Sequence, residues 1–218
     1  TRSLKFTVLV TAVYVVTSQL MLVIYVYPLS KNYLKGVKFF RLFTLFSMLF
    51  NGGILPTYLV VRSLGLLNTM WALIIPTLIS PFNAILLMTF FKTISSEYEE
   101  AARVEGASHL AILFKIYLPM SKPAFLTILL FGMVGRWNGW FDALMYITRN
   151  EYFTLQIVLR NLLALADTSM LRVTVIAPAP LPSIQAAALI FAIFPILLVY
   201  PFLQKYFVKG IMLGGIKG

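Results

Sequence analysis

The sequence contains no cysteine, a single histidine and only seven acidic residues among its 218 positions. The lack of cysteine excludes disulfides and thiolate metal sites, and it leaves the redox compartment undetermined. Only 11% of the residues are charged, whereas 60% are hydrophobic. A soluble domain of this length would need far more charge to cover its surface. Lipid is therefore the solvent for much of this chain.

Long runs without charged residues mark the candidate membrane spans. About 20 apolar residues cross the hydrocarbon core of a bilayer as a helix, and several runs in this sequence reach that length. Their length and their lack of polar alternation favour helices, which satisfy their own backbone hydrogen bonds. We predict an all-α polytopic membrane protein with five helices. The predicted spans are 5–28, 39–61, 69–91, 123–147 and 184–205.

Basic residues are distributed unequally between the two sides that five spans create. The larger set comprises Lys31, Lys35, Lys38, Arg41, Lys92, Arg103, Lys115, Lys122, Lys205, Lys209 and Lys217. The smaller set comprises Arg2, Lys5, Arg62, Arg149, Arg160 and Arg172. The positive-inside rule makes the larger set cytoplasmic. Topology and contact with anionic membrane lipid thus explain the net charge of +11, and no nucleic-acid partner is expected.

A polar segment interrupts the apolar sequence in the cytoplasmic loop predicted at about 93–121. A Ser-x-x-Glu capping box predicts that a helix begins at Ser96. Gly106 suits a helix end that needs a positive φ. A second helix is predicted from Ser108 to about Leu118, with Pro119 stopping or bending it. Taken alone, this pattern is that of a capped helical hairpin on the membrane surface.

The spacing within this segment resembles the EAA signature of the permease subunits of ABC importers. The matching residues are Glu100, Ala101, Ala102, Gly106, Ile116, Leu118 and Pro119. The resemblance implies a coupling helix that docks into a groove of a cytoplasmic ATPase subunit. Glu100, Ala101 and Gly106 would then form the docking core, and Leu118 and Pro119 would join it to the next span. The small alanine side chains permit close packing, and the glycine sets the angle between two short helices.

The resemblance extends over nearly all of the chain and favours the sugar branch of these permeases. It is carried by Phe39–Pro76, Trp137–Ile147 and Tyr200–Gly218, which are similar to permeases for complex oligosaccharides or polysaccharides. It implies the type I importer fold, with residues 1–218 as one transmembrane domain. Such permeases usually have six spans, and this chain begins at Thr1 without methionine. We therefore expect a sixth, N-terminal helix to be missing.

The sequence lacks the G-x-x-x-x-G-K-[ST] phosphate loop. We therefore do not expect this chain to bind ATP by that route. The resemblance implies a transport subunit that is not an enzyme and holds no cofactor or metal, with ATP and Mg bound by a partner ATPase. The resemblance implies a second permease subunit, two ATPase subunits, an extracytoplasmic solute-binding protein and a sugar substrate. It places the chain in the bacterial cytoplasmic (inner) membrane. His109 has no neighbouring metal-binding or proton-transfer partner in the sequence and is expected at the surface.

Several polar and aromatic residues inside the predicted spans are candidates for a substrate pathway, because intramembrane polar groups usually face a protein interior or a water-filled route. They are Asn83, Arg136, Trp137, Asn138, Trp140 and Asp142. Indole faces can stack on sugar rings. Packing of the tryptophans, a helix cap at Asn138 and an interhelical hydrogen bond from Asn83 are open alternatives. Arg136 and Asp142 would lie about 120° apart on a continuous helix, so no tight pair between them is predicted.

Breaks are predicted within two spans, at Asn51-Gly52-Gly53 together with Pro56 and at Ser80-Pro81. The external segment at 148–183 either contacts a binding protein or forms an ordinary solvated loop. Two other functions stay open at this stage. One is an ABC permease for another small solute, such as a peptide or an amino acid. The other is an ATP-independent secondary transporter or channel, which would need intramembrane carboxylates as relays, and only Asp142 qualifies.

Overall fold

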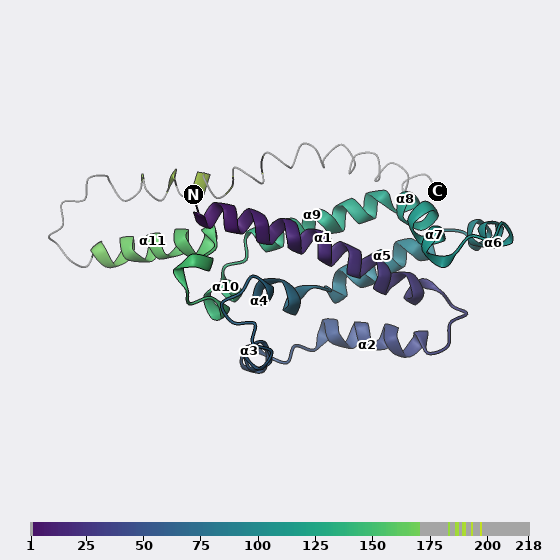
Figure 1. Cartoon of the computed structure of the whole chain (residues 1–218), viewed down its shortest axis with the longest axis horizontal. Helices are drawn as coiled ribbons and strands as arrows, with labels where there is room; N and C mark the ends of the chain where they lie inside the picture. The colour runs from purple at the N-terminus through teal and green to yellow at the C-terminus, as the bar shows by residue number, and fades with distance from the viewer. Residues whose placement is uncertain are drawn as a thin grey trace, which may run out of the picture. The chain divides into compact units, whose positions relative to one another are not determined.

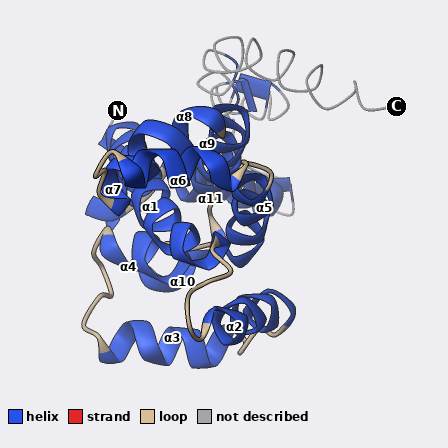
Figure 2. Cartoon of the chain, turned by 90° about the vertical axis from the view of Figure 1, so that its right-hand side faces the viewer, coloured by secondary structure: helices blue, strands red, loops and turns tan. Residues whose placement is uncertain are grey.

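The computed structural model describes residues 2–170 and seven separate residues between 183 and 197. Residues 171–182 of the external segment, the tail from Tyr200 and, apart from those few residues, the predicted span at 184–205 lie outside the described residues. Every regular element in the part described is a helix, shown in blue in Figure 2. The all-α prediction is confirmed there. The chain divides into two compact units, one of 1–13, 54–76 and 133–204 and another of 14–53, 77–132 and 205–218.

The first predicted span is confirmed as α1, Arg2–Ser30, drawn in purple in Figure 1. It is the one described helix that is long and apolar enough to cross a membrane by itself. Its last carbonyl groups lack intrahelical donors, as in any helix. Arg41 supplies one such donor, since its Nε donates to the Leu29 carbonyl at 2.7 Å, and its Nη2 donates to the carbonyl of Lys31, just after the helix, at 3.1 Å.

The second predicted span consists of two helices, as the break predicted within it implies. These are α2, Val37–Leu49, and α3, Ile54–Ser63. The break predicted at Asn51-Gly52-Gly53 is confirmed. Gly53 has φ of 96°, and the Asn51 side chain accepts a hydrogen bond from its N–H at 2.9 Å. This left-handed conformation lies directly before α3, and glycine adopts it without steric cost. Pro56, predicted to mark the same break, lies in the first turn of α3.

The third and fourth predicted spans are also interrupted. The third consists of α4 (Trp71–Ile74), η1 (Ile75–Thr77) and α5 (Pro81–Lys92). Ser80 caps α5 with Pro81 at its first position, which confirms the predicted break. The fourth consists of α9 (Lys122–Trp137) and α10 (Phe141–Tyr146). The helices of the third span are together apolar enough to cross a membrane as one broken span, and so is α9 when it is joined with the preceding segment His109–Met120.

The external segment is more regular than a loop. It contains η3, Asn150–Tyr152, and α11, Leu155–Met170. Thr154 precedes α11 and is buried, and its hydroxyl accepts from the Ile157 N–H at 3.5 Å. The Thr7 hydroxyl accepts from the Leu155 N–H at 2.8 Å, which ties the start of α11 to α1.

The unit that contains the polar hairpin has a continuous apolar core. Its members come from α1, α5, the second half of the hairpin and α9: Leu22, Val23, Val26, Tyr27, Ala84, Leu87, Phe91, Ile112, Leu113, Tyr117 and Ile128. Leu87 and Ile128 are fully buried. The hairpin is therefore packed against the spans of its own unit.

In the other unit, Asn68 forms hydrogen bonds with the end of α10 and with the connection that follows it toward η3. It is the one described residue other than glycine with a positive φ, 60°. Its side-chain oxygen accepts from the Thr148 N–H at 2.7 Å, the Thr148 hydroxyl at 3.0 Å and the Arg149 N–H at 3.0 Å. Its own N–H donates to the Tyr146 carbonyl at 3.0 Å. Asparagine suits this role because its short amide tolerates the left-handed region.

Asn68→Ala should destabilise the protein by about 2 kcal/mol, because three donors lose their acceptor and alanine is strained at positive φ. Asn68→Asp is the matched control, since its carboxylate keeps the acceptor. Thermal unfolding in detergent checks this prediction. Equal unfolding temperatures for the two variants would show that the side-chain oxygen is dispensable.

Candidate functional site

The polar hairpin consists of four short elements that follow one another between α5 and α9. They are α6 (Ser96–Val104), α7 (His109–Ile112), the π-helical η2 (Leu113–Tyr117) and α8 (Leu118–Met120). The predicted start of α6 at Ser96 is confirmed. The predicted capping residue was wrong, since the Ser95 hydroxyl accepts from the Glu97 N–H at 3.4 Å. Ser95 and Ser96 are adjacent, so the sequence alone left the position of the N-cap uncertain by one residue.

Gly106 ends the first helix as predicted, with φ of 79°. The Gly106 N–H donates to the Arg103 carbonyl and the Ala107 N–H to the Ala102 carbonyl, both at 2.9 Å. These bonds close the helix end in the way that a left-handed glycine allows. A β-carbon at Gly106 would have no atom within 4 Å. Within this chain, glycine is therefore favoured at position 106 by its positive φ and not by crowding from neighbouring atoms.

The second half of the hairpin begins as predicted at Ser108, whose hydroxyl accepts from the Ala111 N–H at 3.3 Å. It continues through Pro119 to Met120, and the chain then bends by 85° into α9. The π-helical turn directly precedes Pro119. A proline removes a backbone donor and crowds the preceding turn, and a wider turn relieves both effects.

The residues of the EAA signature divide between two surfaces of the hairpin. Glu100, Ala101 and Gly106 are exposed. Ala102, Ile116 and Leu118 are partly buried and pack against the apolar core of their unit. Pro119 is exposed beside the bend. The signature thus combines an outward face with the residues that fix that face to the spans.

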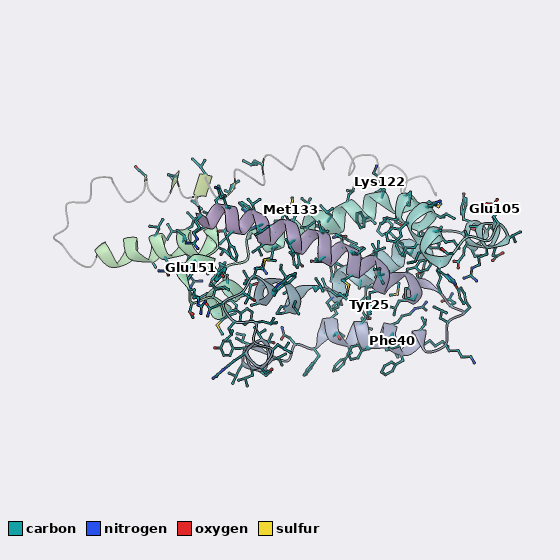
Figure 3. All side chains as sticks on the ribbon, in the orientation of Figure 1. Tyr25, Phe40, Glu105, Lys122, Met133 and Glu151 are labelled. Atoms are coloured by element: carbon teal, nitrogen blue, oxygen red, sulfur yellow. The ribbon has the colours of Figure 1, made fainter. Side chains whose placement is uncertain are left out.

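Two apolar side chains that were not predicted extend the outward face. Val104 is 90% exposed and Leu110 is 63% exposed, and Glu105 marks the turn between them in Figure 3. We call the exposed set Glu100, Ala101, Val104, Gly106 and Leu110 the outward face. Both side chains are accessible to a partner protein, and Val104 belongs to the otherwise polar helix α6. Val104 was recognisable in the sequence as the apolar residue after Arg103 in a charged helix.

Behind the outward face, the carboxylate of Glu99 lies in a buried cluster that sequence reasoning missed. Glu99 forms ion pairs with Lys31 and, at 2.5 Å, with Arg103. It also accepts hydrogen bonds from the hydroxyls of Tyr33 and Tyr117, both at 3.0 Å. The side chains of Lys31 and Glu99 are only 5% and 7% exposed. Lys31 lies 68 positions away in sequence, so no local pattern reveals the pair.

The Lys31 ammonium group is further enclosed by aromatic rings. It lies 3.6 Å from the ring centre of Tyr117 and 4.4 Å from that of Tyr27. Cation–π contacts of this kind are stronger where water is excluded. His109 is exposed as expected, and its Nδ1 lies 3.4 Å from the Tyr27 hydroxyl.

The surroundings of Glu99 strongly favour its charged form. Burial alone would raise the pKa of this carboxyl, but Lys31 and the two tyrosine hydroxyls lower it from an ordinary 4.5 to about 2. Burial lowers the pKa of Lys31, and Glu99 opposes that change. The folded protein therefore holds the cluster as an ion pair at neutral pH.

The cluster should stabilise the protein in a pH-dependent way. Because the folded pKa of Glu99 is below its ordinary value, its contribution is complete above about pH 4.5 and is lost as the pH falls toward 2. The facing groups Lys31, Arg103, Tyr33, Tyr117 and Tyr27 do not titrate in that window. The unfolding temperatures of wild type and Glu99→Gln should converge over it. A constant difference down to the lowest pH would contradict the assignment.

Arg136 and Asp142 form an ion pair of 2.5 Å, so the prediction that they would not pair was wrong. The helix between them is broken at 138–140, which removes the continuous rotation on which that prediction depended. Arg136 is buried and also donates to the Leu73 carbonyl at 2.5 Å. A β-carbon at Gly139 would collide with the Arg136 guanidinium group. A side chain at this position would therefore displace the Arg136 guanidinium group from its contacts with Asp142 and the Leu73 carbonyl.

The other candidates for a substrate pathway lie in different surroundings. Trp137 is 5% exposed and belongs to the packed interior. Asn138 and Trp140 are exposed, and the Arg160 guanidinium lies 3.6 Å from the Trp140 ring centre. Asn83 belongs to the other unit, where its N–H donates to the Ser80 hydroxyl at 3.4 Å. The role of these six residues in a pathway stays a prediction.

The family model of the binding-protein-dependent transport system inner membrane component matches residues 5–213. The chain belongs to this family. It is thus a transport permease subunit and a multi-pass inner membrane protein. Among the described residues, no group of three or more metal-ligating side chains comes together.

Curated relatives and a solved structure agree with this membership. The chain is 46% identical over 194 residues to protein LplC of Bacillus subtilis, covering 88% of this chain and 66% of LplC. It is 41% identical over 220 residues to the polygalacturonan/rhamnogalacturonan transport system permease protein YtcP of Bacillus subtilis, covering 100% of this chain and 77% of YtcP. A bacterial ABC transporter involved in the import of the acidic polysaccharide alginate matches with a TM-score of 0.84 and 35% identity, covering 94% of this chain and 74% of the matched chain. The fold is that of an ABC importer transmembrane domain.

Proposed function

We propose that this chain is the membrane-spanning subunit of an ATP-driven importer for an oligosaccharide or polysaccharide. Its relatives include permeases named for polygalacturonan/rhamnogalacturonan and for arabinooligosaccharides. The solved structure that it resembles belongs to an alginate importer. The observation that carries the mechanism is the outward face of the hairpin, in which Glu100, Ala101 and Gly106 are exposed together.

In the proposed complex, this chain pairs with a second permease subunit, two ATPase subunits and an extracytoplasmic binding protein. ATP and Mg bind to the ATPase subunits. The outward face docks into an ATPase groove, with Glu100 as the charged contact and Val104 and Leu110 as apolar contacts. Closure of the ATPase dimer moves the hairpin, and alternating access of the substrate route follows.

The pairing of Asp142 favours this function over ion-driven transport. A carboxylate relay needs a group that can take up and release a proton. Asp142 is held in an ion pair with the buried Arg136. Among the described spans, the carboxylate that the alternative requires is therefore already engaged.

Uptake by the complex reconstituted in liposomes tests the proposal. Labelled oligosaccharide should accumulate only when the ATPase subunits, hydrolysable ATP and the binding protein are all present. A nonhydrolysable ATP analogue is the matched control. Uptake driven by an ion gradient without the ATPase would contradict the proposal, and uptake of a peptide or amino acid instead would correct its cargo.

A further inference from the structure

The two neighbouring glutamates of α6 have opposite surroundings. Glu100 is exposed on the outward face, whereas the side chain of Glu99 is 7% exposed and accepts bonds from other segments. Glu100 makes no ion pair with any residue between 2 and 170. Adjacent acids on one helix are thus divided between an outer surface and an internal anchor.

The anchor joins three parts of the chain. Lys31 directly follows the last residue of α1, and Tyr33 belongs to the connection that leads to α2. Tyr117 is the last residue of η2. All three contact the single carboxylate of Glu99. Arg41 binds the carbonyl groups of Leu29 and Lys31, so the end of α1 is itself held.

The burial of this pair decides how firmly α6 is held. Removing one partner of a buried pair leaves an uncompensated charge, which is strongly unfavourable. Ion pairs exposed to solvent contribute little to stability and hold their two segments together only weakly. The Arg2–Glu151 pair is of that kind, at 3.8 Å with both side chains more than half exposed. The buried Lys31–Glu99 pair therefore adds a strong polar link between α6 and the end of α1 to the apolar packing of Ala102 against the core.

We propose that Glu99 is a positioning residue that clamps α6 to the C-terminal end of α1 through Lys31. Displacement of α6 by a docked partner then moves the end of α1 with it. The inference rests on the proposed function, since it needs an ATPase on the outward face. Glu99 touches neither that ATPase nor the substrate, and its role is to convert docking into movement of a span.

The ratio of substrate imported to ATP hydrolysed by the reconstituted complex is the decisive readout. Glu99→Gln should assemble with the ATPase and hydrolyse ATP, while the ratio falls about tenfold, within the range of known coupling energies. Glu97→Gln is the matched control, because Glu97 is an exposed acid of the same helix. It should keep the wild-type ratio.

A covalent clamp tests the same idea by rescue. The chain has no cysteine, so the double variant K31C/E99C can be bridged specifically by a short bifunctional thiol reagent. The unbridged variant should import less substrate per ATP hydrolysed than wild type, and bridging should restore the wild-type ratio. The single variants K31C and E99C, treated with the same reagent, control for reactions on partner subunits.

Two results would overturn the clamp. One is a wild-type ratio in Glu99→Gln. The other is a bridged K31C/E99C complex that fails to assemble or to couple transport to ATP hydrolysis. If Glu99→Gln does not assemble, the bridged K31C/E99C complex alone tests the clamp. Failure of the proposed function is distinguishable, because the unaltered complex would then show no ATP-driven uptake.

Discussion

Gly106→Leu is expected to leave the protein inserted in the membrane while ATP-driven uptake falls more than about tenfold. Gly106 has φ of 79°, a conformation that costs other L-residues about 1–2 kcal/mol. A new side chain there meets no atom of the chain itself within 4 Å. It projects instead from the outward face, where the ATPase is proposed to dock. The loss should therefore arise from docking more than from folding.

Gly106→Asn is the matched control, since asparagine tolerates positive φ and is smaller than leucine. Its uptake should lie between those of wild type and Gly106→Leu. Uptake, ATP hydrolysis and membrane insertion are measured for both variants. Unchanged uptake in Gly106→Leu would remove Gly106 from the docking surface.

The second large effect is expected at the broken span. Asp142→Asn should destabilise the protein by about 3 kcal/mol, because it leaves the buried Arg136 charge without its partner. Gly139→Ala should act in the same direction, since its β-carbon would collide with the same guanidinium group. Both changes should lower the unfolding temperature in detergent and the amount of inserted protein.

Arg62→Gln is the control for this pair of variants, because Arg62 is an exposed basic residue near the end of α3. Its unfolding temperature should equal that of wild type. If Asp142→Asn were as stable as Arg62→Gln, the ion pair would have no structural role. The break at 138–140 would then need another cause.

The broad arrangement of this protein could be predicted from sequence because lipid imposes strong and local rules. A run of apolar residues must form a helix, and α1 does so. Local chemistry also predicted the hairpin, where Ser108 caps a helix and Gly106 adopts the left-handed conformation. In both cases the decisive residues lie within a few positions of the structure that they determine.

Features that depend on distant contacts could not be predicted in this way. Glu99 fitted a capping box, yet its carboxylate binds Lys31 across 68 positions of sequence. Arg136 and Asp142 were judged on a continuous helix, yet the chain breaks between them and brings them together. Asn68 shows no motif, although its side chain accepts three hydrogen bonds from residues about 80 positions away. Polar contacts of this kind are defined by tertiary structure alone.

Site-specific cross-linking from the outward face tests the central claim most directly. In this cysteine-free chain, A101C places one thiol on the exposed side of α6. Within the assembled complex it should cross-link to an ATPase subunit, and the yield should change when ATP is added. A thiol at the buried Ala84 of α5 (A84C) should give no such product. An A101C complex that hydrolyses ATP and imports substrate, yet never cross-links to the ATPase, would contradict docking at the outward face.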